Sequence, residues 1–539
     1  MKLWPFDILY PETSDEEIEE GVDRARRAGA NTLIFYLEEE QMYRTIVDEA
    51  GFKGILAKAA TLVEEAHAAG LKTICYLNGL EVMAHDACDD QTTRSLSRTH
   101  PEWLQKDISG RPMVWTCIEN DWITEDMEDA WASPYSGFKG LMRRRIISLA
   151  RAGVDALYID QVSLPGMQNL GERWASSDPR FASAFRKQYG LAVPARVDWS
   201  STEWRKFVWF RHQAVQSYLA YLTQAASSAG AATFFEASTN DTSDGTLLGN
   251  DPSFSVQSGA AFSPEIEPEG DDLAAFRMAK FARDIRLDQP IIYLGWPASS
   301  ADALKEFAIA ICESGNYYPT ADSPHPAGAF SFMDTIGDVL DRRVPYAEVA
   351  LIYSARNKDW TYSDEGAFSK YVTAFRTLSE RHLPFRIVPL ETLASTPDVD
   401  AAVLPGIESM RDDEFRLVKD LRVVLLGENA TRDEWGSDRQ PPLNFPNVVS
   451  LGSLHAHLPF SLTAPARTRI EYYTDRDDPS RYFLFAYSGA ATGRLTLSSS
   501  SALTGSAFEM GKSPRKLNGK RIDLPLSSPL LVIELRAGS

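Results

Sequence analysis

Residues 153–161 read Gly-Val-Asp-Ala-Leu-Tyr-Ile-Asp-Gln, and this stretch decides the predicted fold. An amphipathic segment precedes it and ends at Gly153, a typical stop signal for a helix. The apolar run at 156–159 has the length of a buried strand. The stretch therefore predicts a helix, a short connection and a strand that ends on the carboxylate of Asp160.

The same order of helix, glycine and strand recurs on both sides of this stretch. Ser14 and Glu17 form a capping box that starts the first predicted helix, and Gly29 ends it. Further helices are predicted at 53–69, 134–152 and 204–229, and strands at 4–10, 32–37, 73–77, 156–159 and 232–236. Strands that alternate with helices indicate a parallel sheet with right-handed crossovers.

Three more strands are predicted at 255–262, 290–294 and 316–320, with helices at 273–286 and 299–314. Eight such strands can form an open doubly wound sheet or a closed (β/α)8 TIM barrel. No G-x-G-x-x-G motif follows the first strand, which disfavours a dinucleotide-binding sheet. The number of units favours the barrel with long loops.

Two further regions follow the eight units in this chain of 539 residues. Strands at 348–353, 385–388, 401–404 and 423–426 with a helix at 366–381 predict a small α/β domain. Strands at 469–473, 482–488, 493–497 and 530–535, separated by Ser, Gly and Pro, predict an antiparallel β domain, with a surface turn at 498–501. We therefore divide the chain into domains 1–343, 344–460 and 461–539.

The charge balance excludes several kinds of partner. The chain has 55 Lys and Arg against 75 Asp and Glu, a net charge of −20. Such a chain repels phosphate backbones and anionic lipid, so neither nucleic acid nor a membrane surface is expected to bind. The first apolar run is broken by Pro5 and Asp7 and is not a signal peptide, and no segment has the roughly 18 apolar residues of a membrane span. We expect a cytoplasmic protein.

The four cysteines, Cys75, Cys88, Cys117 and Cys312, show no C-x-x-C spacing. This pattern predicts a reducing compartment, no disulfide and no zinc site. The acidic pairs His85-Asp86 and Asp89-Asp90 could hold a cation, but their oxygen spacing favours a solvated loop. We expect neither a metal nor a cofactor.

Carboxylates stand where several predicted strands end, and in a barrel this is where catalytic groups lie. Asp160 ends the fourth strand, Glu236 the fifth, and Glu265 follows the sixth. Two carboxyl groups that face one pocket are what the cleavage of a glycosidic bond requires. No G-x-S-x-G elbow or paired Cys and His motif offers another nucleophile.

Other side chains at these strand ends and in the long loop at 85–133 have the chemistry of a sugar site. Aromatic faces pack on the apolar face of a pyranose, while polar groups bind its hydroxyls. We expect substrate contacts from Asn78, Trp115, Asp121, Tyr135, Trp296 and His325.

Five motifs follow one another in the first region: Pro101-Glu102-Trp103 with Asp107 and Gly110, Arg111-Pro112, Trp115-Thr116-Cys117, Ser133-Pro134-Tyr135 and Val154 to Asp160. In this order they resemble the hypothetical glycosyl hydrolase barrels, which are distantly similar to α-L-fucosidases and α-amylases. The resemblance implies that Asp160 is the nucleophile. The α-amylase pattern implies Glu236 as acid/base, and other barrels with a fourth-strand aspartate imply Glu265. Gly295-Trp296 stands where α-amylases have a histidine-aspartate signature.

The second region also resembles a known domain. Residues 349–353, Ala401-Ala402-Val403-Leu404-Pro405, and the segments 412–418 and 423–427 are similar to the trimerisation domain of family 42 β-galactosidases, which has a class I amidotransferase-like fold. The resemblance implies a homo-oligomer, a trimer or a dimer. No cysteine follows Cys312, which excludes glutaminase chemistry.

The sequence thus predicts a glycoside hydrolase that acts on an oligosaccharide or glycoside. If Asp160 and Glu236 are the pair, they end neighbouring strands about 4.8 Å apart, which suits retention through a covalent intermediate. If Glu265 is the donor, the gap approaches the roughly 6.5–9.5 Å of an inverting site. The alternatives are a non-catalytic glycan-binding protein, or a sugar isomerase or lyase on the same barrel.

Overall fold

The computed structural model describes residues 1–38, 41–118, 123–165, 172–237, 241–266, 272–320, 323–395, 399–489 and 493–537. The chain forms two compact units. The first contains Met1–Glu265 and Asp288–Ile292, and the second contains Ile266–Leu287 and Tyr293–Ser539. Each unit is described by itself.

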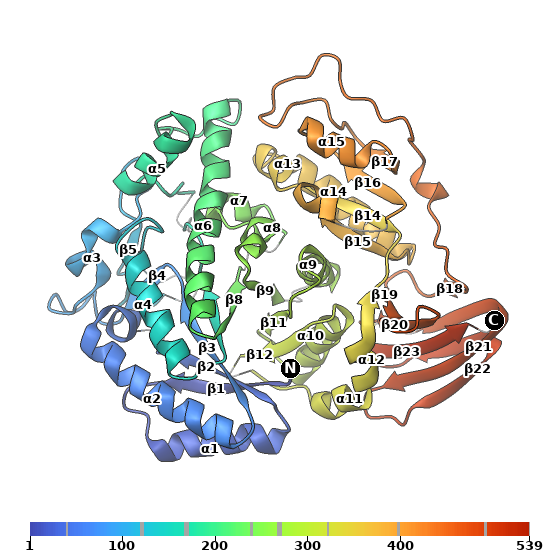
Figure 1. The fold of residues 1–539 in the computed structure, drawn as a ribbon, viewed down its shortest axis with the longest axis horizontal. Helices are drawn as coiled ribbons and strands as arrows, with labels where there is room; N and C mark the ends of the chain where they lie inside the picture. Colours follow the sequence, from blue (N-terminus) through green and yellow to red (C-terminus); the bar gives the residue numbers. More distant parts are fainter. Residues whose placement is uncertain are drawn as a thin grey trace. The chain divides into compact units, whose positions relative to one another are not determined.

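The first unit is built on a six-stranded sheet, and the pairings within it are parallel (Figure 1). This confirms the predicted alternation of strands and helices. Two strands have the predicted bounds, because each is an apolar run bordered by polar residues. The strand order is β1 (Leu3–Leu9), β2 (Thr32–Leu37), β3 (Lys72–Asn78), β7 (Ala156–Asp160), β8 (Ala232–Glu236) and β9 (Ala261–Ser263).

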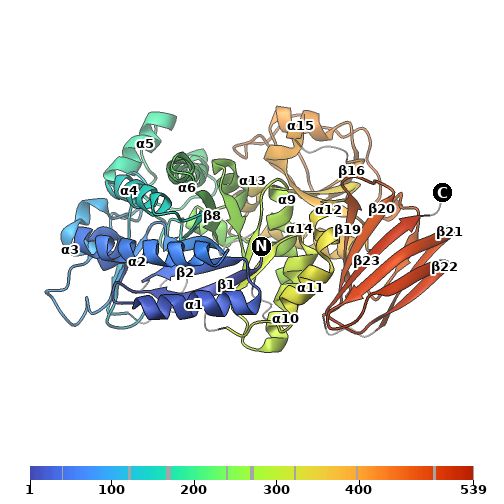
Figure 2. The ribbon, with the colours of Figure 1, turned by 60° about the horizontal axis from the view of Figure 1, so that its bottom comes forward.

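The helices of this unit begin and end at the signals that the sequence contains. Ser14 and Glu17 form the predicted capping box, and Gly29 ends the first helix at φ 81°, in the left-handed region. Gly153 has φ 101° just before β7. Figure 2 shows the first two helices beside β1 and β2. The main helices are α1 (Asp15–Ala28), α2 (Glu49–Ala68), α4 (Phe138–Arg151), α5 (Pro179–Tyr189) and α6 (Thr202–Ser228).

The predicted strand at 255–262 is wrong over most of its length. Asp251 accepts a hydrogen bond from the backbone of Ser253 (3.0 Å) and starts a short helix with Pro252 in its first turn. A helical turn follows, and only β9 is extended. The segments concerned are α8 (Pro252–Ser255) and the 3₁₀ turn Val256–Ser258.

The long loop at 85–133 has structure of its own. Two strands of the loop and the strand that precedes it form a three-stranded antiparallel sheet with the order β4-β6-β5. Cys88 and Cys117 form a disulfide in this loop, so the expectation of no disulfide is wrong. Their separation of 29 residues carries no recognisable motif. The strands are β4 (Glu81–Ala84), β5 (Val114–Thr116) and β6 (Glu128–Trp131).

The seventh and eighth predicted strands are present, but they pair in a second sheet. Among the described residues this sheet has the order β10-β11-β12 and is separate from the six-stranded sheet. The described pairings therefore establish a mixed α/β fold, and closure into a TIM barrel stays a prediction. The elements are β10 (Glu265–Ile266), α9 (Asp272–Ile285), β11 (Ile292–Gly295), α10 (Ser300–Cys312) and β12 (Asn316–Pro319).

The second unit continues with the predicted parallel α/β region. Its sheet has the order β15-β14-β16-β17, and Ile352, Val388 and Leu404 lie in its core. The elements are β14 (Val349–Tyr353), α13 (Ala355–Trp360), α14 (Gly366–Glu380), β15 (Phe385–Pro389), β16 (Ala401–Pro405), α15 (Asp412–Val418) and β17 (Arg422–Leu426).

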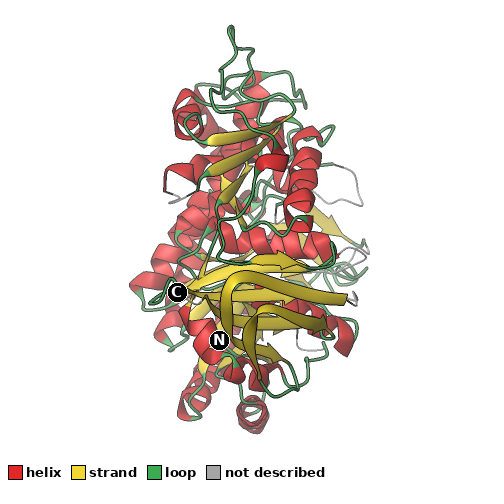
Figure 3. Ribbon diagram, turned by 90° about the vertical axis from the view of Figure 1, so that its right-hand side faces the viewer, coloured by secondary structure: helices red, strands yellow, loops and turns green. Residues whose placement is uncertain are grey.

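The C-terminal strands form the predicted antiparallel sheet, seen beside the C label in Figure 3. The turn predicted at 498–501 is wrong, because these serines lie within one long strand whose register shifts between Ser498 and Leu503. Alternate residues of that strand are buried, among them Leu495 and Leu497. The strands are β13 (Arg343–Pro345), β18 (Ser461–Thr463), β19 (Arg469–Asp475), β20 (Arg481–Tyr487), β21 (Gly493–Glu509), β22 (Arg515–Leu526) and β23 (Leu530–Ala537).

Short helical segments connect these elements. They are the π-helix Tyr43–Val47, α3 (Leu96–Thr99), Pro101–Trp103, α7 (Asp244–Leu248), α11 (Ala329–Thr335), α12 (Gly337–Arg342), Leu390–Ser395 and Leu451–Ser453. Within the described ranges, no helix has both the length and the apolar character that crossing a membrane requires. The division into three domains stays a prediction.

Candidate active site

Tyrosines form a row across three neighbouring strands of the first unit. Tyr36, Tyr76 and Tyr158 are register partners on β2, β3 and β7. The ring centroids of Tyr36 and Tyr76 are 4.3 Å apart, and those of Tyr76 and Tyr158 are 4.8 Å apart. Side chains along a strand alternate with a period of two, so the residues two positions after these tyrosines lie on the same face of the sheet.

The polar row lies at those positions, where the strands end. It consists of Glu38, Asn78, Asp160 and Glu236, and all four are buried. Asn78 and Asp160 are register partners, and Glu236 is paired with Ser263 of β9. The sequence therefore places amide and carboxyl groups side by side at the carboxyl ends of parallel strands, where ligands bind in such folds.

Asp160 is held at both carboxylate oxygens. The hydroxyl of Tyr76 donates to Oδ2, and the backbone N–H of Gln161 donates to Oδ1 at 2.6 Å. The side chain is 6% exposed. Donors to both oxygens fix the orientation of the carboxyl group.

Glu236 has the opposite surroundings. It is 2% exposed, and its Oε1 accepts no hydrogen bond from an N–H or O–H group of the described residues. Burial raises the pKa of Glu236 well above its usual value, and the negative charges of Asp160 and Glu265 raise it further. A hydrogen bond with Asp160 acts in the same direction. Burial and the neighbouring charges therefore favour the protonated form of the Glu236 carboxyl.

The same charges act on the neighbouring phenol. Burial first, and then Glu236 and Asp160, raise the pKa of Tyr158 well above its usual value. Ser263 lies 2.8 Å from the Tyr158 hydroxyl and donates to the carbonyl of Ile292 at 2.7 Å. Tyr158 stays neutral and lies two residues before Asp160, on the same face of β7. The structure thus brings together the three carboxyl groups that the sequence singled out, Asp160, Glu236 and Glu265.

The residues predicted to contact the substrate have different surroundings in the structure. Asn78 lies in the polar row, and its Nδ2 donates to Glu81 at 2.9 Å. Trp115 is 3% exposed, and the guanidinium of Arg173 lies 5.3 Å from its ring centroid, so a sugar cannot reach that face unless Arg173 moves. Asp121 lies outside the described residues.

Tyr135 packs within an aromatic cluster. Its ring centroid lies 5.7 Å from that of Phe181 and 6.2 Å from that of Phe210. Burial and the charge of Asp178 raise the pKa of Tyr135 to about 12. These contacts fit a structural position, so a role in binding stays a prediction.

Two predicted contacts belong to the second unit. Trp296 follows β11 and is 51% exposed, the largest exposed aromatic ring among the described residues. His325 is half-buried, and burial lowers its pKa. Their roles stay predictions.

Sequence reasoning missed Tyr76, Glu81 and Asp129. Tyr76 could have been found from alternation, because it stands two residues before Asn78 on the same face of β3. Glu81 precedes the long loop and Asp129 lies within it, and the pairing of β4 with β6 brings the two together. No spacing in the sequence marks that pairing.

Within the described ranges, two clusters have the donor atoms of a cation site. They are His85, Asp86 and Asp126, and Glu348, Asp400 and His457. In the first, His85 Nδ1 lies 2.6 Å from Asp126 Oδ2, a contact that an ion pair alone explains. Neither cluster includes Asp160, Glu236 or Glu265, so the carboxyl groups of the polar row are a separate feature.

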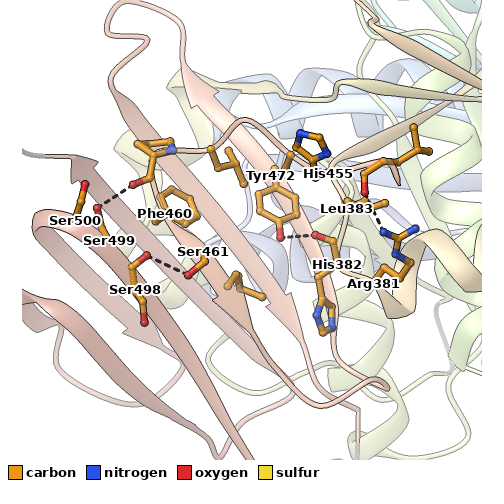
Figure 4. Close-up of a pocket in the computed structure, with 15 residues that line it drawn as sticks. Arg381, His382, Leu383, His455, Phe460, Ser461, Tyr472, Ser498, Ser499 and Ser500 are labelled. Atoms are coloured by element: carbon orange, nitrogen blue, oxygen red, sulfur yellow. Dashed lines mark hydrogen bonds between the residues drawn. The ribbon is translucent and has the colours of Figure 1, made fainter. Parts of the chain in front are cut away.

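The second unit contains a cavity of about 490 Å³ (Figure 4). Its lining includes Arg381, His382 and Tyr472, and no lining residue carries a carboxylate. Arg381 donates to the carbonyl of Leu454 at 2.9 Å, and the Tyr472 hydroxyl donates to the carbonyl of His382 at 2.8 Å. The cavity therefore lacks the acid and base groups found at the ends of β7 and β8.

No protein-family model matches the sequence, and no curated protein matches it. Among solved structures, a β-galactosidase from the psychrophilic Marinomonas ef1 matches with a TM-score of 0.66 at 12% identity, over 100% of both chains. A GH5_18 protein from Streptomyces cattleya matches with a TM-score of 0.45 at 12% identity, over 79% of this chain and 98% of the other. The catalytic domain of a β-amylase from Paenibacillus polymyxa gives 0.43 at 11% identity, over 62% and 97%. The first match shows a shared fold along the whole chain.

Proposed function

We propose that the chain is a retaining glycoside hydrolase with Asp160 as nucleophile and Glu236 as acid/base. The observation that carries the proposal is the pair itself. Two buried carboxyl groups at the ends of neighbouring strands are hydrogen-bonded to each other; donors hold both oxygens of Asp160, while burial and negative neighbours raise the pKa of Glu236. Two carboxyl groups with opposite surroundings are the requirement for glycoside hydrolysis.

Asp160 attacks the anomeric carbon of the bound sugar. Tyr76 and the backbone of Gln161 hold its two oxygens, so the carboxyl group is already oriented before the substrate binds. Attack forms a bond between a carboxylate oxygen and the anomeric carbon and breaks the bond to the leaving oxygen. The product of this step is a glycosyl ester on Asp160.

Glu236 gives its proton to the leaving oxygen as that bond breaks. Formation of the ester removes the charge of Asp160, which is one cause of the raised pKa of Glu236. The pKa of Glu236 then falls, and the carboxylate can take a proton from the water that hydrolyses the ester. Glu265 supplies a second negative charge that keeps Glu236 protonated in the free enzyme.

The contact between Asp160 and Glu236 favours retention over inversion. An inverting pair holds its carboxyl groups about 6.5–9.5 Å apart, with room for a water, whereas a retaining pair lies about 5–5.5 Å apart. Carboxyl groups within hydrogen-bonding distance fit the shorter of these separations better. Glu265 thus has the role of a charged neighbour, and its assignment as acid/base is the weaker alternative.

The shared fold with a β-galactosidase supports an oligosaccharide or glycoside as substrate. The sequence resemblance of the region 344–460 to a trimerisation domain leads us to propose a homo-oligomer as well, a trimer or a dimer. Multi-angle light scattering at micromolar concentration tests the assembly, and a monomer would contradict it.

The activity is tested on a panel of nitrophenyl glycosides and oligosaccharides with three proteins: the wild type, Asp160→Asn and Asp155→Asn. Asp155 stands before β7 and binds His67 and Thr73 at 2.9 and 2.8 Å, away from the pair. We expect at least about a 10³-fold loss of kcat/KM in Asp160→Asn and a small change in Asp155→Asn. Near-normal turnover by Asp160→Asn, or binding of sugars without turnover by the wild type, would contradict the proposal.

A further inference from the structure

A second pair of buried carboxyl groups, Glu81 and Asp129, lies beside the polar row. Glu81 is 1% exposed and Asp129 is not exposed. Glu81 begins β4 and Asp129 lies in β6, two strands of the small antiparallel sheet in the long loop. The mechanism proposed above does not use either residue.

Both residues lie on one face of that sheet. Glu81 is the register partner of Trp131, and Met83 is the partner of Asp129. Since partners and every second residue share a face, Glu81 and Asp129 are diagonal neighbours within reach of each other. Glu128 points to the other face, where it accepts from Ser95 (2.8 Å) and from the backbone of Ser97 (3.0 Å).

The contacts of the pair lead directly to Asn78. Trp131 Nε1 donates to Asp129 Oδ2 at 2.9 Å, and Asp129 is hydrogen-bonded to Glu81. Asn78 Nδ2 donates to Glu81 Oε2 at 2.9 Å. Asp129 Oδ1 is buried and accepts from no N–H or O–H group of the described residues.

Two carboxyl groups in this setting share a proton. Burial raises the pKa of Asp129 to about 7, although the hydrogen bonds from Trp131 and Glu81 lower it in part. Carboxylates that are buried in contact cannot both be ionised without a large cost, so the pair titrates as a unit. At and below neutral pH it holds at least one proton.

Asn78 receives its orientation from this pair. Glu81 Oε2 accepts a hydrogen bond from the NH₂ side of the Asn78 amide. The amide oxygen Oδ1 then points away from Glu81. It is buried, has no donor among the described residues, and stands on the strand position opposite Asp160.

We propose that Glu81 and Asp129 form a proton-sharing pair that positions Asn78, so that Asn78 Oδ1 accepts a hydrogen bond from a sugar hydroxyl next to the anomeric carbon. The sugar rests on the function proposed above, whereas the positioning of Asn78 does not. Glu81 and Asp129 are positioning residues, and Asn78 is the group that touches substrate. When the pair loses its last proton, repulsion between the two charges separates Glu81 from Asn78.

Other charged groups near the pair are accounted for in the test. Glu128 lies next to Asp129 in β6, and Arg173 covers Trp115, the partner of Asp129 on β5. On the other side of Asn78 lie the carboxyl groups of Asp160 and Glu236. A pH-dependent signal from Asn78 must therefore be assigned to the correct pair.

The test is a pH titration, from 5 to 8.5, of the side-chain amide of Asn78 by NMR in protein labelled with ¹⁵N-asparagine. The signal is assigned by its loss in Asn78→Asp. Asp129→Asn keeps the shape and both hydrogen bonds but removes the ionisation. Asp178→Asn is the matched control, because burial also raises the pKa of Asp178, which caps α5 and has no contact with Asn78.

We expect the amide protons of Asn78 to shift with a midpoint near pH 7 in the wild type and in Asp178→Asn, and to lose that shift in Asp129→Asn. A shift that persists in Asp129→Asn would assign the titration to Asp160 and Glu236 and would overturn the proposal. Absence of a shift in the wild type would overturn it as well. If Asp129→Asn does not fold, Glu81→Gln serves, with the midpoint expected to move down by at least one pH unit.

None of these signals requires turnover, so they remain informative if the chain is not a glycosidase. On a hydrolysed glycoside, KM in the wild type should rise about tenfold from pH 6 to 8, and Asp129→Asn should show a flat KM. An equal rise in both proteins would contradict the link to the sugar hydroxyl.

Discussion

Buried carboxyl groups occur in both units, but their neighbours differ. At the ends of β7 and β8, the neighbours of Glu236 are Asp160 and Glu265, which are also acidic. In the second unit, Arg283 lies 2.8 Å from Asp284 and 2.7 Å from Glu471, and Lys280 lies 2.6 Å from Glu471. The described neighbours that raise the pKa of Glu236 are acidic, whereas the cluster in the second unit is built around cations.

The two clusters therefore have opposite electrostatics. Burial acts to raise the pKa of Asp284, but Arg283 and Lys280 outweigh it and the pKa is lowered. The pKa of Glu236 is raised, because burial and its neighbours act together. Glu313 in the second cluster lies between these cases, since burial raises its pKa although Arg283 opposes this. Uncompensated carboxyl groups reduce stability, and their presence indicates a function that needs them.

The largest effect on activity after that of Asp160→Asn is expected from Glu236→Gln. It removes the proton donor but leaves the nucleophile, so kcat/KM should fall about 10²–10⁴-fold on substrates with poor leaving groups. Nitrophenyl glycosides, whose leaving groups need little protonation, should be affected least. Steady-state kinetics on an alkyl and a nitrophenyl glycoside measure the difference.

Glu265→Gln is the control for this prediction. It removes a charge that raises the pKa of Glu236, and its effect should not depend on the leaving group. If Glu265→Gln shows that dependence and Glu236→Gln does not, the two glutamates exchange roles.

The compensated cluster should respond through stability. Arg283→Met removes the cation that contacts Asp284 and one of the two that contact Glu471, and the free energy of unfolding should fall by about 3–5 kcal/mol. Arg342→Met, which breaks an exposed pair with Asp338 at 2.9 Å, should cost less than about 1 kcal/mol. Denaturant titration of both variants measures this. Equal losses of stability in the two variants would show that the buried cluster contributes no more to stability than the exposed pair.

The smallest expected effect is a difference between Glu236→Gln and the wild type in how the free energy of unfolding depends on pH. The folded-state pKa of Glu236 is raised, so its contribution to stability is complete below the unfolded pKa of about 4.3 and is lost as the pH rises. From pH 5 to 7, Glu236→Gln should gain stability over the wild type by about 1.4 kcal/mol per pH unit. Asp284 has the opposite sign, with stability lost as the pH falls. A constant difference between the two proteins would contradict the raised pKa.

The sequence was most informative where apolar runs have clear borders. The runs at β2 and β8 gave their bounds, and the rule that polar groups end parallel strands gave Asp160 and Glu236. It failed around β9, because the helix cap at Asp251 resembles an ordinary polar residue in an apolar stretch.

Contacts that depend on tertiary pairing could not be read from one chain. Glu81 and Asp129 meet only because β4 pairs with β6, and the Cys88–Cys117 bond forms in the same loop. Trp115 has an aromatic ring of the kind that packs on a sugar, yet Arg173 covers the face of that ring. Residue type indicates what a side chain can do, but only the fold decides what it faces.

The stereochemistry of the reaction tests the central claim most directly. The first-formed product of a hydrolysed glycoside is observed by ¹H NMR before its anomers equilibrate. If Asp160 attacks and Glu236 protonates, the product keeps the anomeric configuration of the substrate, because two displacements occur in sequence. An inverted first product would show that water attacks the sugar directly, and this would contradict a covalent intermediate on Asp160.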